Sequence, residues 1–176
     1  MSGEGHKDWV ANLDFHPKGS HLATCSGDST IKIWDFLKAS CVATFDAHIH
    51  PVWAVSFNDT GDFVISGSMD STCKLFDIPK QKMRQTFRGH TDSVNDVQFA
   101  RCSNVFASAG ADKTISLWDI REGLLKKTFY GHLNAVNHID FSLDVIDSLF
   151  KLILPREIHY APATQTGSSK SGTSGW

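Results

Sequence analysis

The sequence lacks a long apolar run and an excess of charge of either sign. Lysine and arginine number 17 against 19 aspartates and glutamates in 176 residues, which gives a net charge of -2. No basic excess therefore draws the whole chain to nucleic acid or to an anionic membrane surface. The most apolar segment, residues 141–154, contains Asp144, Asp147 and Lys151 and is shorter than the roughly 20 residues of a membrane-spanning helix. We expect a protein that binds neither nucleic acid nor membranes.

The sequence also lacks closely spaced cysteines. Cys25, Cys41, Cys73 and Cys102 form no CxxC pair, a spacing that suits neither a zinc site nor a small disulfide scaffold. We interpret them as reduced thiols that pack as small hydrophobic side chains. The first ten residues contain no apolar segment of the kind found in secretory signals. These features favour a cytoplasmic location.

What the sequence does contain is a repeat with a period of 42 residues. Three features recur in one register. They are a histidine preceded by glycine or alanine, a later aspartate, and an aromatic residue followed directly by aspartate. The histidines are His6, His48, His90 and His132, the first aspartates are Asp28, Asp70 and Asp112, and the aromatic residues are Trp34, Phe76 and Trp118. Such self-similarity at a fixed period indicates a repeat architecture.

Each period predicts four short strands. Apolar and polar residues alternate, as in Ile31-Lys32-Ile33, and residues that favour turns, such as those at 16–19 and 58–61, separate the alternating runs. We place the strands of the first unit near residues 8–15, 21–26, 30–35 and 40–45. Those of the next two units are displaced by 42 and 84 residues.

A Gly-His opening, a Trp-Asp close and four strands per unit resemble the WD-repeat family of β-propellers over roughly residues 5–144. The resemblance implies an all-β fold, a partial (open) WD-repeat β-propeller of three four-stranded blades plus the first strand of a fourth, with an irregular C-terminal tail. The repeats lie near 5–35, 47–77 and 89–119, with an incomplete one at 131–144 whose strand is expected at 135–141. Residues 145–176 form a non-repeat tail, and its Gly-, Ser- and Thr-rich end is expected to be disordered.

The resemblance also implies a structural hydrogen-bonded set in each blade. The sets are His6, Thr24, Asp28 and Trp34; His48, Ser66 and Asp70; and His90, Ser108, Asp112 and Trp118. Phe76 replaces tryptophan in the second set and has no donor, so we expect Ser66 to be one partner short and the second blade to be the loosest. The same residue types could form a hydrolytic triad. Their recurrence in every unit favours the structural interpretation, and we expect no enzyme activity, cofactor or metal.

Binding is expected where the repeats differ from one another. The loops after the histidines and the first strands supply the partner-binding candidates Lys7, Trp9, His50, Trp53, Asp92 and Asn134. Trp9 and Trp53 are the foremost candidates, because exposed aromatic residues carry much of the energy of protein interfaces. The alternative is that either ring packs between blades.

A closer similarity gives a more specific expectation. Residues 8–36, 89–99 and 111–120 resemble WD-repeat proteins of the axonemal central pair, of the sperm-associated antigen type. That resemblance implies a non-catalytic scaffold for protein–protein interaction, with axonemal partners, in the cytoskeleton of motile cilia and sperm flagella. The alternative is a truncated or alternative-end product that acts as a competing short form or has no independent function. Because such propellers usually close with seven blades, we expect the open blade faces to be covered by self-association, by a partner or by residues 145–154.

Overall fold

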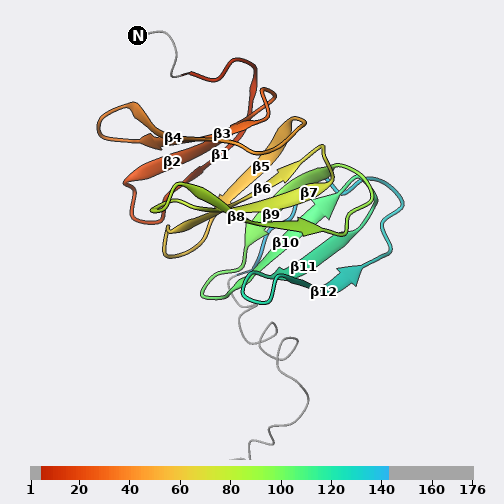
Figure 1. Ribbon diagram of the computed structural model, residues 1–176. Helices are drawn as coiled ribbons and strands as arrows, with labels where there is room; N and C mark the ends of the chain where they lie inside the picture. The colour runs from red at the N-terminus through yellow and green to blue at the C-terminus, as the bar shows by residue number, and fades with distance from the viewer. Residues whose placement is uncertain (1–4, 143–176) are drawn as a thin grey trace, which may run out of the picture.

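Twelve β-strands make up the computed structural model, which describes residues 5–142, and no helix occurs in that range (Figure 1). None of its elements could cross a membrane as an apolar helix. The strands of the first sheet are β1 (Val10–Phe15), β2 (His21–Ser26), β3 (Thr30–Asp35) and β4 (Ser40–Asp46). Those of the second are β5 (Val52–Phe57), β6 (Phe63–Ser68), β7 (Thr72–Asp77) and β8 (Lys82–Arg88). Those of the third are β9 (Val94–Phe99), β10 (Val105–Gly110), β11 (Ile115–Asp119) and β12 (Leu124–Phe129).

Each group of four strands forms an antiparallel sheet in which consecutive strands are neighbours. The prediction of four strands per unit is confirmed, and each sheet's first strand begins two residues later than expected. The three sheets follow one another in space without closing into a ring over residues 5–142 (Figure 1). The chain is therefore an open arc of three blades.

The blades stack through their first strands, since β5 contacts β1 and β2 of the preceding blade and β9 contacts β5 and β6. Val52, Val55 and Phe57 of β5 pack in one core with residues of the first blade such as Ile31 and Ile33. The corresponding residues of β9 are Val94, Val97 and Phe99, which pack with Ile65, Leu75 and other residues of the second blade. Full burial of each such side chain contributes about 1.5 to 3 kcal/mol, so the cores between blades hold the arc together.

The segment at 135–141 differs from the predicted strand. Its residues show no ladder pairing, because the described part of the chain contains no second strand of a fourth unit for it to pair with. The Val136 amide donates a hydrogen bond to the Gly110 carbonyl at 3.1 Å, and Ile139 and Phe141 pack against the core of the third blade. The segment therefore covers the face of the third blade as β5 and β9 cover those before them. The predicted tail at 145–176 lies outside the described residues.

Two β-bulges recur in every blade. In the first strand, Ala11, Trp53 and Asn95 are the extra residues that have no partner on the second strand. In the fourth strand, Val42, Arg84 and Lys126 are the extra residues. A bulge re-aims the side chain of its extra residue and disturbs the ladder locally. In the exposed fourth strand, the bulge interrupts an edge that could pair with another chain. In the first strand, the bulge presents one distinct residue per blade.

Candidate functional site

The sets predicted from the repeat come together in the structure. In the third blade, His90 Nδ1 lies 2.8 Å from Asp112 and His90 Nε2 lies 2.7 Å from Ser108 Oγ. Trp118 Nε1 donates to the same hydroxyl at 2.7 Å. Because Nδ1 faces a carboxylate it carries the proton, which leaves Nε2 to accept from the serine. The set joins the loop before the blade to its second and third strands.

The first blade holds the same arrangement. His6 Nδ1 lies 3.1 Å from Asp28, His6 Nε2 lies 2.7 Å from Thr24 Oγ1, and Trp34 Nε1 donates to that hydroxyl at 2.8 Å. The His6 side chain is buried like that of His90, but Trp34 is only partly buried whereas Trp118 is buried. The first set therefore lies nearer to solvent than the third.

The second blade has Phe76 where the other two have tryptophan. His48 lies 2.7 Å from both Asp70 and Ser66 Oγ, and Ser66 Oγ also lies 3.3 Å from the Lys74 carbonyl oxygen. The single Ser66 proton goes either to His48 Nε2 or to the Lys74 carbonyl, so no donor replaces the missing indole N–H. Phe76 therefore leaves Ser66 without the donor that Trp34 and Trp118 supply in the other two sets. Phe76 is fully buried and its ring lies 4.7 Å from that of Phe45, so it contributes packing instead of a hydrogen bond.

The carboxylates of these sets are held in their charged form. Burial by itself would raise the pKa of the Asp112 carboxyl, but hydrogen bonds from Thr114, His90 and the Thr91 amide outweigh it and lower that pKa. The pKa values of Asp28 and Asp70 are lowered in the same way, against burial, by hydrogen bonds from threonine and histidine. This arrangement repeats in three blades, and its hydrogen bonds join the loop before each blade to the strands of that blade.

The cysteines and the metal-ligating side chains point to no second chemistry. Burial raises the pKa of the Cys25 and Cys73 thiols to about 12, and all four cysteines are free. Over residues 5–142 there is no cluster of three or more His, Cys, Asp or Glu side chains that could hold a metal ion. Reactivity of a thiol requires the thiolate, so the two buried cysteines act as core side chains.

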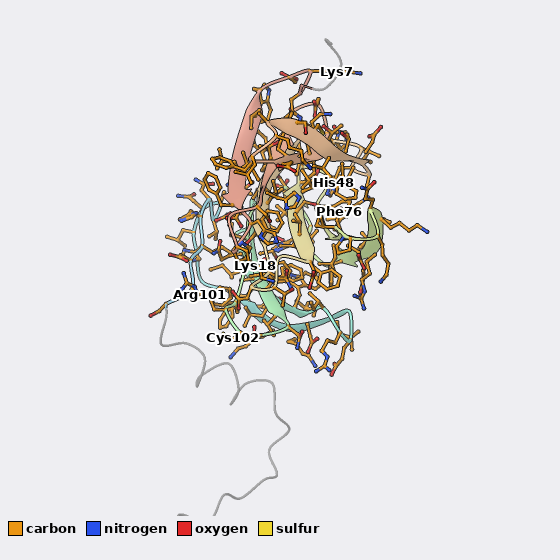
Figure 2. All side chains as sticks on the ribbon, turned by 90° about the vertical axis from the view of Figure 1, so that its left-hand side faces the viewer. Lys7, Lys18, His48, Phe76, Arg101 and Cys102 are labelled. Atoms are coloured by element: carbon orange, nitrogen blue, oxygen red, sulfur yellow. The ribbon has the colours of Figure 1, made fainter. Side chains whose placement is uncertain are left out.

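Most of the partner-binding candidates are exposed side chains in the loops that precede the first strands. They are Lys7, His50, Asp92 and Asn134. Figure 2 shows Lys7 at one end of the molecule, with Arg101 and Cys102 at the other and His48 and Phe76 between them. The main-chain amide of Lys7 donates to Asp28 at 2.8 Å, so this loop is tied to the first hydrogen-bonded set. The first set thus positions the loop that carries Lys7.

Trp9 and Trp53 lie against each other. Their ring centroids are 5.0 Å apart with an angle of 28° between the ring planes, and the residues are 45% and 36% exposed. Trp9 belongs to the loop before β1, whereas Trp53 is the bulge residue of β5. The two rings therefore pack against each other between the first and second blades, and both remain partly open to solvent.

A pocket of about 430 Å³ lies beside the two tryptophans. Its lining residues are Trp9, Ala11, Trp53, Asn95 and Asn137. Four of these, at positions 11, 53, 95 and 137, occupy the same position of the repeat, and the first three are the bulge residues of β1, β5 and β9. Each unit therefore contributes its own side chain to one shared surface.

Asn95 and Asn137 were not among the sequence candidates. The signal that could have found them is the register itself, because positions 11, 53, 95 and 137 carry alanine, tryptophan and two asparagines while their neighbours 10, 52, 94 and 136 are all valine. A variable position next to a constant one is typical of a repeat's binding surface. Which variable positions face one another depends on the bulges, and these appear only once the strands are paired.

The sequence and the fold each match known proteins. A profile of the family described as WD domain, G-beta repeat matches residues 1–35, 39–77 and 81–119, which is more than half of the chain. An F-box protein of Saccharomyces cerevisiae is 40% identical over 48 residues, which cover 27% of this chain and 8% of that protein. The nuclear distribution protein PAC1 of Tuber melanosporum is 46% identical over 48 residues, which cover 26% of this chain and 11% of that protein.

Two solved structures share the fold. One is described as U3-55K and has a TM-score of 0.73, and the other is described as the RRP9 WD40 repeats and has a TM-score of 0.72. Both are 21% identical in sequence, and the match covers 74% of this chain but only 42% and 41% of theirs. The chain thus spans well under two thirds of the length of each of these proteins.

Proposed function

Because the chain belongs to the WD-repeat family, we propose that it is a non-catalytic scaffold that binds other proteins through the surface around Trp9 and Trp53. The observation that carries this proposal is the repeat position occupied by residues 11, 53, 95 and 137, the first three of which are the bulge residues of the first strands. Valine is constant at one position, whereas the next residue differs between blades and lines a shared pocket. Constant positions build the blades, and the variable ones are free to fit a partner.

The chemistry of this surface suits a protein interface. Trp9 and Trp53 are large, half-exposed and held in place by stacking, so a partner can cover them with little loss of side-chain entropy. The hydrogen-bonded sets fix the loops around them, since the amides of Lys7 and Thr91 both donate to set aspartates. A preorganised aromatic surface of this kind binds more tightly than a mobile one.

The setting proposed for this scaffold is the axoneme of motile cilia and sperm flagella, with axonemal proteins as its partners. Support comes from the resemblance of residues 8–36, 89–99 and 111–120 to WD-repeat proteins of the central pair. The corresponding location is the cytoplasm and its cytoskeleton. A chain that acted as a competing short form would carry the same binding surface but would reduce the binding of a longer relative.

Co-sedimentation of the purified full chain with demembranated axonemes tests both parts of the proposal. We expect the wild-type chain to pellet with axonemes and Trp53→Ala to weaken this binding by about tenfold or more, the scale of an interface hot spot. Tyr130→Ala, which removes an exposed aromatic ring outside the pocket lining, is the matched control and should bind as the wild type does. Unchanged binding of Trp53→Ala would reject this surface, and absence of the wild-type chain from the pellet would reject the axonemal setting.

A second surface concerns self-association, which we also propose. Val10, Leu13 and Phe15 on the face of β1 are 51 to 53% exposed, whereas the residues in the same register of β5 and β9 are buried against the preceding blade. Nothing within residues 5–142 covers this face. A second copy could cover it symmetrically, because the same patch on two chains is complementary to itself when both are apolar and sheet-like.

A further inference from the structure

Trp9 and Trp53 do not have equivalent roles in the pocket. A Cβ atom added to Gly27 would meet Cε2 of Trp9 at 2.5 Å and its neighbours Cζ2 and Nε1 at 2.8 Å. Cε2 lies between Nε1 and Cζ2 on the indole, so an approach within the ring plane would bring one of those two atoms nearer than Cε2. Because Cε2 is the nearest atom, Gly27 lies over the ring face. Trp53 stacks on Trp9 with a centroid distance of 5.0 Å. Trp9 is thus held between Gly27 and Trp53, and the ring face that remains open belongs to Trp53.

The pocket wall contributed by the third blade and the segment after it consists of carboxamides. Asn95 Nδ2 donates to the Val136 carbonyl oxygen at 3.0 Å and lies 3.3 Å from Asn137 Oδ1. These contacts fix the Asn95 amide group and use its donors. Among the described residues, the Asn95 carbonyl oxygen has no hydrogen-bond donor, so the pocket offers an acceptor opposite an aromatic face.

The charge of the surrounding wall has one sign. The innermost segments of the four units are Val10–Phe15, Val52–Phe57, Val94–Phe99 and residues 136–141, and they contain Asp14, Asp96 and Asp140 but no lysine or arginine. The one titratable base among them is His138, which lies 2.7 Å from Asp96. None of these carboxylates lines the pocket, and Asp14 and Asp96 accept hydrogen bonds from the Phe57 and Ile139 amides. The preference for a cation therefore comes from the indole face, and the lining offers an anion no cationic side chain.

From these features we infer that the pocket binds the guanidinium group of an arginine side chain presented by a partner protein. The planar guanidinium stacks on an indole face, and its N–H groups donate to carboxamide oxygens in the same plane. A lysine ammonium is a strongly hydrated point charge that cannot stack, and an anion finds no cationic side chain in the pocket lining. This inference rests on the proposed function, because it names the partner group that the surface around Trp9 and Trp53 receives.

The geometry assigns separate parts to the residues of the site. Trp53 and the two asparagines contact the ligand, whereas Trp9 acts as a positioning residue that holds the Trp53 ring against rotation. Gly27 is small because the face of Trp9 lies directly on it. A methyl group at Gly27 therefore displaces Trp9 and alters the site from a distance.

The test is a titration of the full, ¹⁵N-labelled chain with acetyl-Gly-Arg-Gly-amide, followed through the side-chain N–H signals of Trp53, Asn95 and Asn137. The matched probes carry citrulline, which is planar and neutral, or lysine in place of arginine. We expect saturable shifts with the arginine peptide and binding weaker by about tenfold or more for both other peptides. Equal affinity for arginine and citrulline, or no movement of the three residues' signals, would overturn the inference.

Four variants make the result specific. Trp53→Leu and Gly27→Ala should each weaken the arginine peptide by about tenfold, whereas Tyr130→Ala should not change its affinity. Thermal melting checks that each variant is folded, and Trp53→Phe, which keeps a ring face, should restore part of the binding lost in Trp53→Leu. If Trp53→Ala abolishes axoneme binding but the arginine peptide does not bind, the inference fails and the proposed function stands. If Trp53→Ala leaves axoneme binding unchanged, the proposed surface fails.

Discussion

At the scale of single residues, the loop before a blade and the aromatic residue of its third strand are matched in size. A Cβ atom on Gly89 would lie 2.8 Å from Cη2 of Trp118, closer than side-chain carbons approach. In the second blade the corresponding residues are Ala47 and Phe76, and Ala47 packs against the core that contains Phe76. The smaller ring thus leaves room for the methyl group that the larger ring excludes.

This match makes Gly89→Ala a destabilising substitution. We expect it to lower the free energy of unfolding by about 1 to 3 kcal/mol, because the added methyl group overpacks against a buried ring. Gly5→Ala is the matched control in the first repeat, since a Cβ there meets no atom within 4 Å, and its effect should stay within about 0.5 kcal/mol. Urea unfolding of both variants measures the difference. Equal unfolding midpoints for the two would contradict the size match.

The lowered pKa values of the set aspartates predict an acid-sensitive fold. A carboxyl group whose pKa is lower in the folded than in the unfolded chain stabilises the fold above its unfolded pKa of about 3.9. That stabilisation is lost as the pH falls from about 5 through 4 toward the folded pKa. For Asp70, hydrogen bonds from His48 and Thr72 outweigh the opposing effect of burial.

Urea unfolding of the wild type between pH 6 and pH 3 should therefore show stability falling with pH. Asp70→Asn should be less stable than the wild type at pH 6, because the asparagine cannot serve as the same charged acceptor. The variant should also show a flatter dependence on pH over this range. A slope equal to that of the wild type would show that Asp70 does not contribute to the acid sensitivity.

At the scale of elements, the middle blade is the one covered on both faces. Its strands β5, β6 and β7 are nearly continuous runs of buried residues, whereas β1 alternates between exposed and half-buried ones. Sequence reasoning expected the second blade to be the loosest because of Phe76. Burial favours the opposite order, because Phe76 is fully buried and both faces of the second blade pack against a neighbouring blade.

Amide hydrogen exchange read by mass spectrometry tests this order. We expect the slowest exchange in β5 to β7 and faster exchange in β1, whose face lacks a covering blade within residues 5–142. The third blade should fall between them, since Ile139 and Phe141 cover part of its face. Faster exchange in the second blade than in the other two would instead restore the interpretation based on Phe76.

Strands and bulges differ in how well they can be predicted. Alternation of apolar and polar residues located all twelve strands, because the two faces of a strand have different surroundings and the pattern records this along the chain. No comparable sequence pattern marks the bulges at Trp53 and Asn95. A bulge is one extra residue relative to a partner strand, so it exists only in the pairing.

At the scale of the whole molecule, the open arc leaves an apolar face on β1. If two copies meet through this face, association should depend on protein concentration and on Phe15. Phe15→Glu should weaken it by about tenfold or more, since burial of a phenylalanine contributes roughly 1.5 to 3 kcal/mol and the carboxylate must also be desolvated. Sedimentation equilibrium over a range of concentrations measures this, with Tyr130→Glu as the control. A wild-type chain that stays monomeric at high concentration would reject self-association through this face.

The sequence alone determined the architecture of the described chain, namely the 42-residue period and the four strands in each of three units, and its resemblance to the WD-repeat family implied the residues that meet in the hydrogen-bonded sets. It could do so because each of these is repeated, and repetition makes a local pattern readable without knowledge of long-range contacts. Only the tertiary structure decided the properties that arise once in the molecule. The stacking of Trp9 between Gly27 and Trp53 and the carboxamide wall of Asn95 and Asn137 both depend on how particular side chains meet across strands and blades. No periodic signal marks such contacts, because they join residues that differ from one repeat to the next.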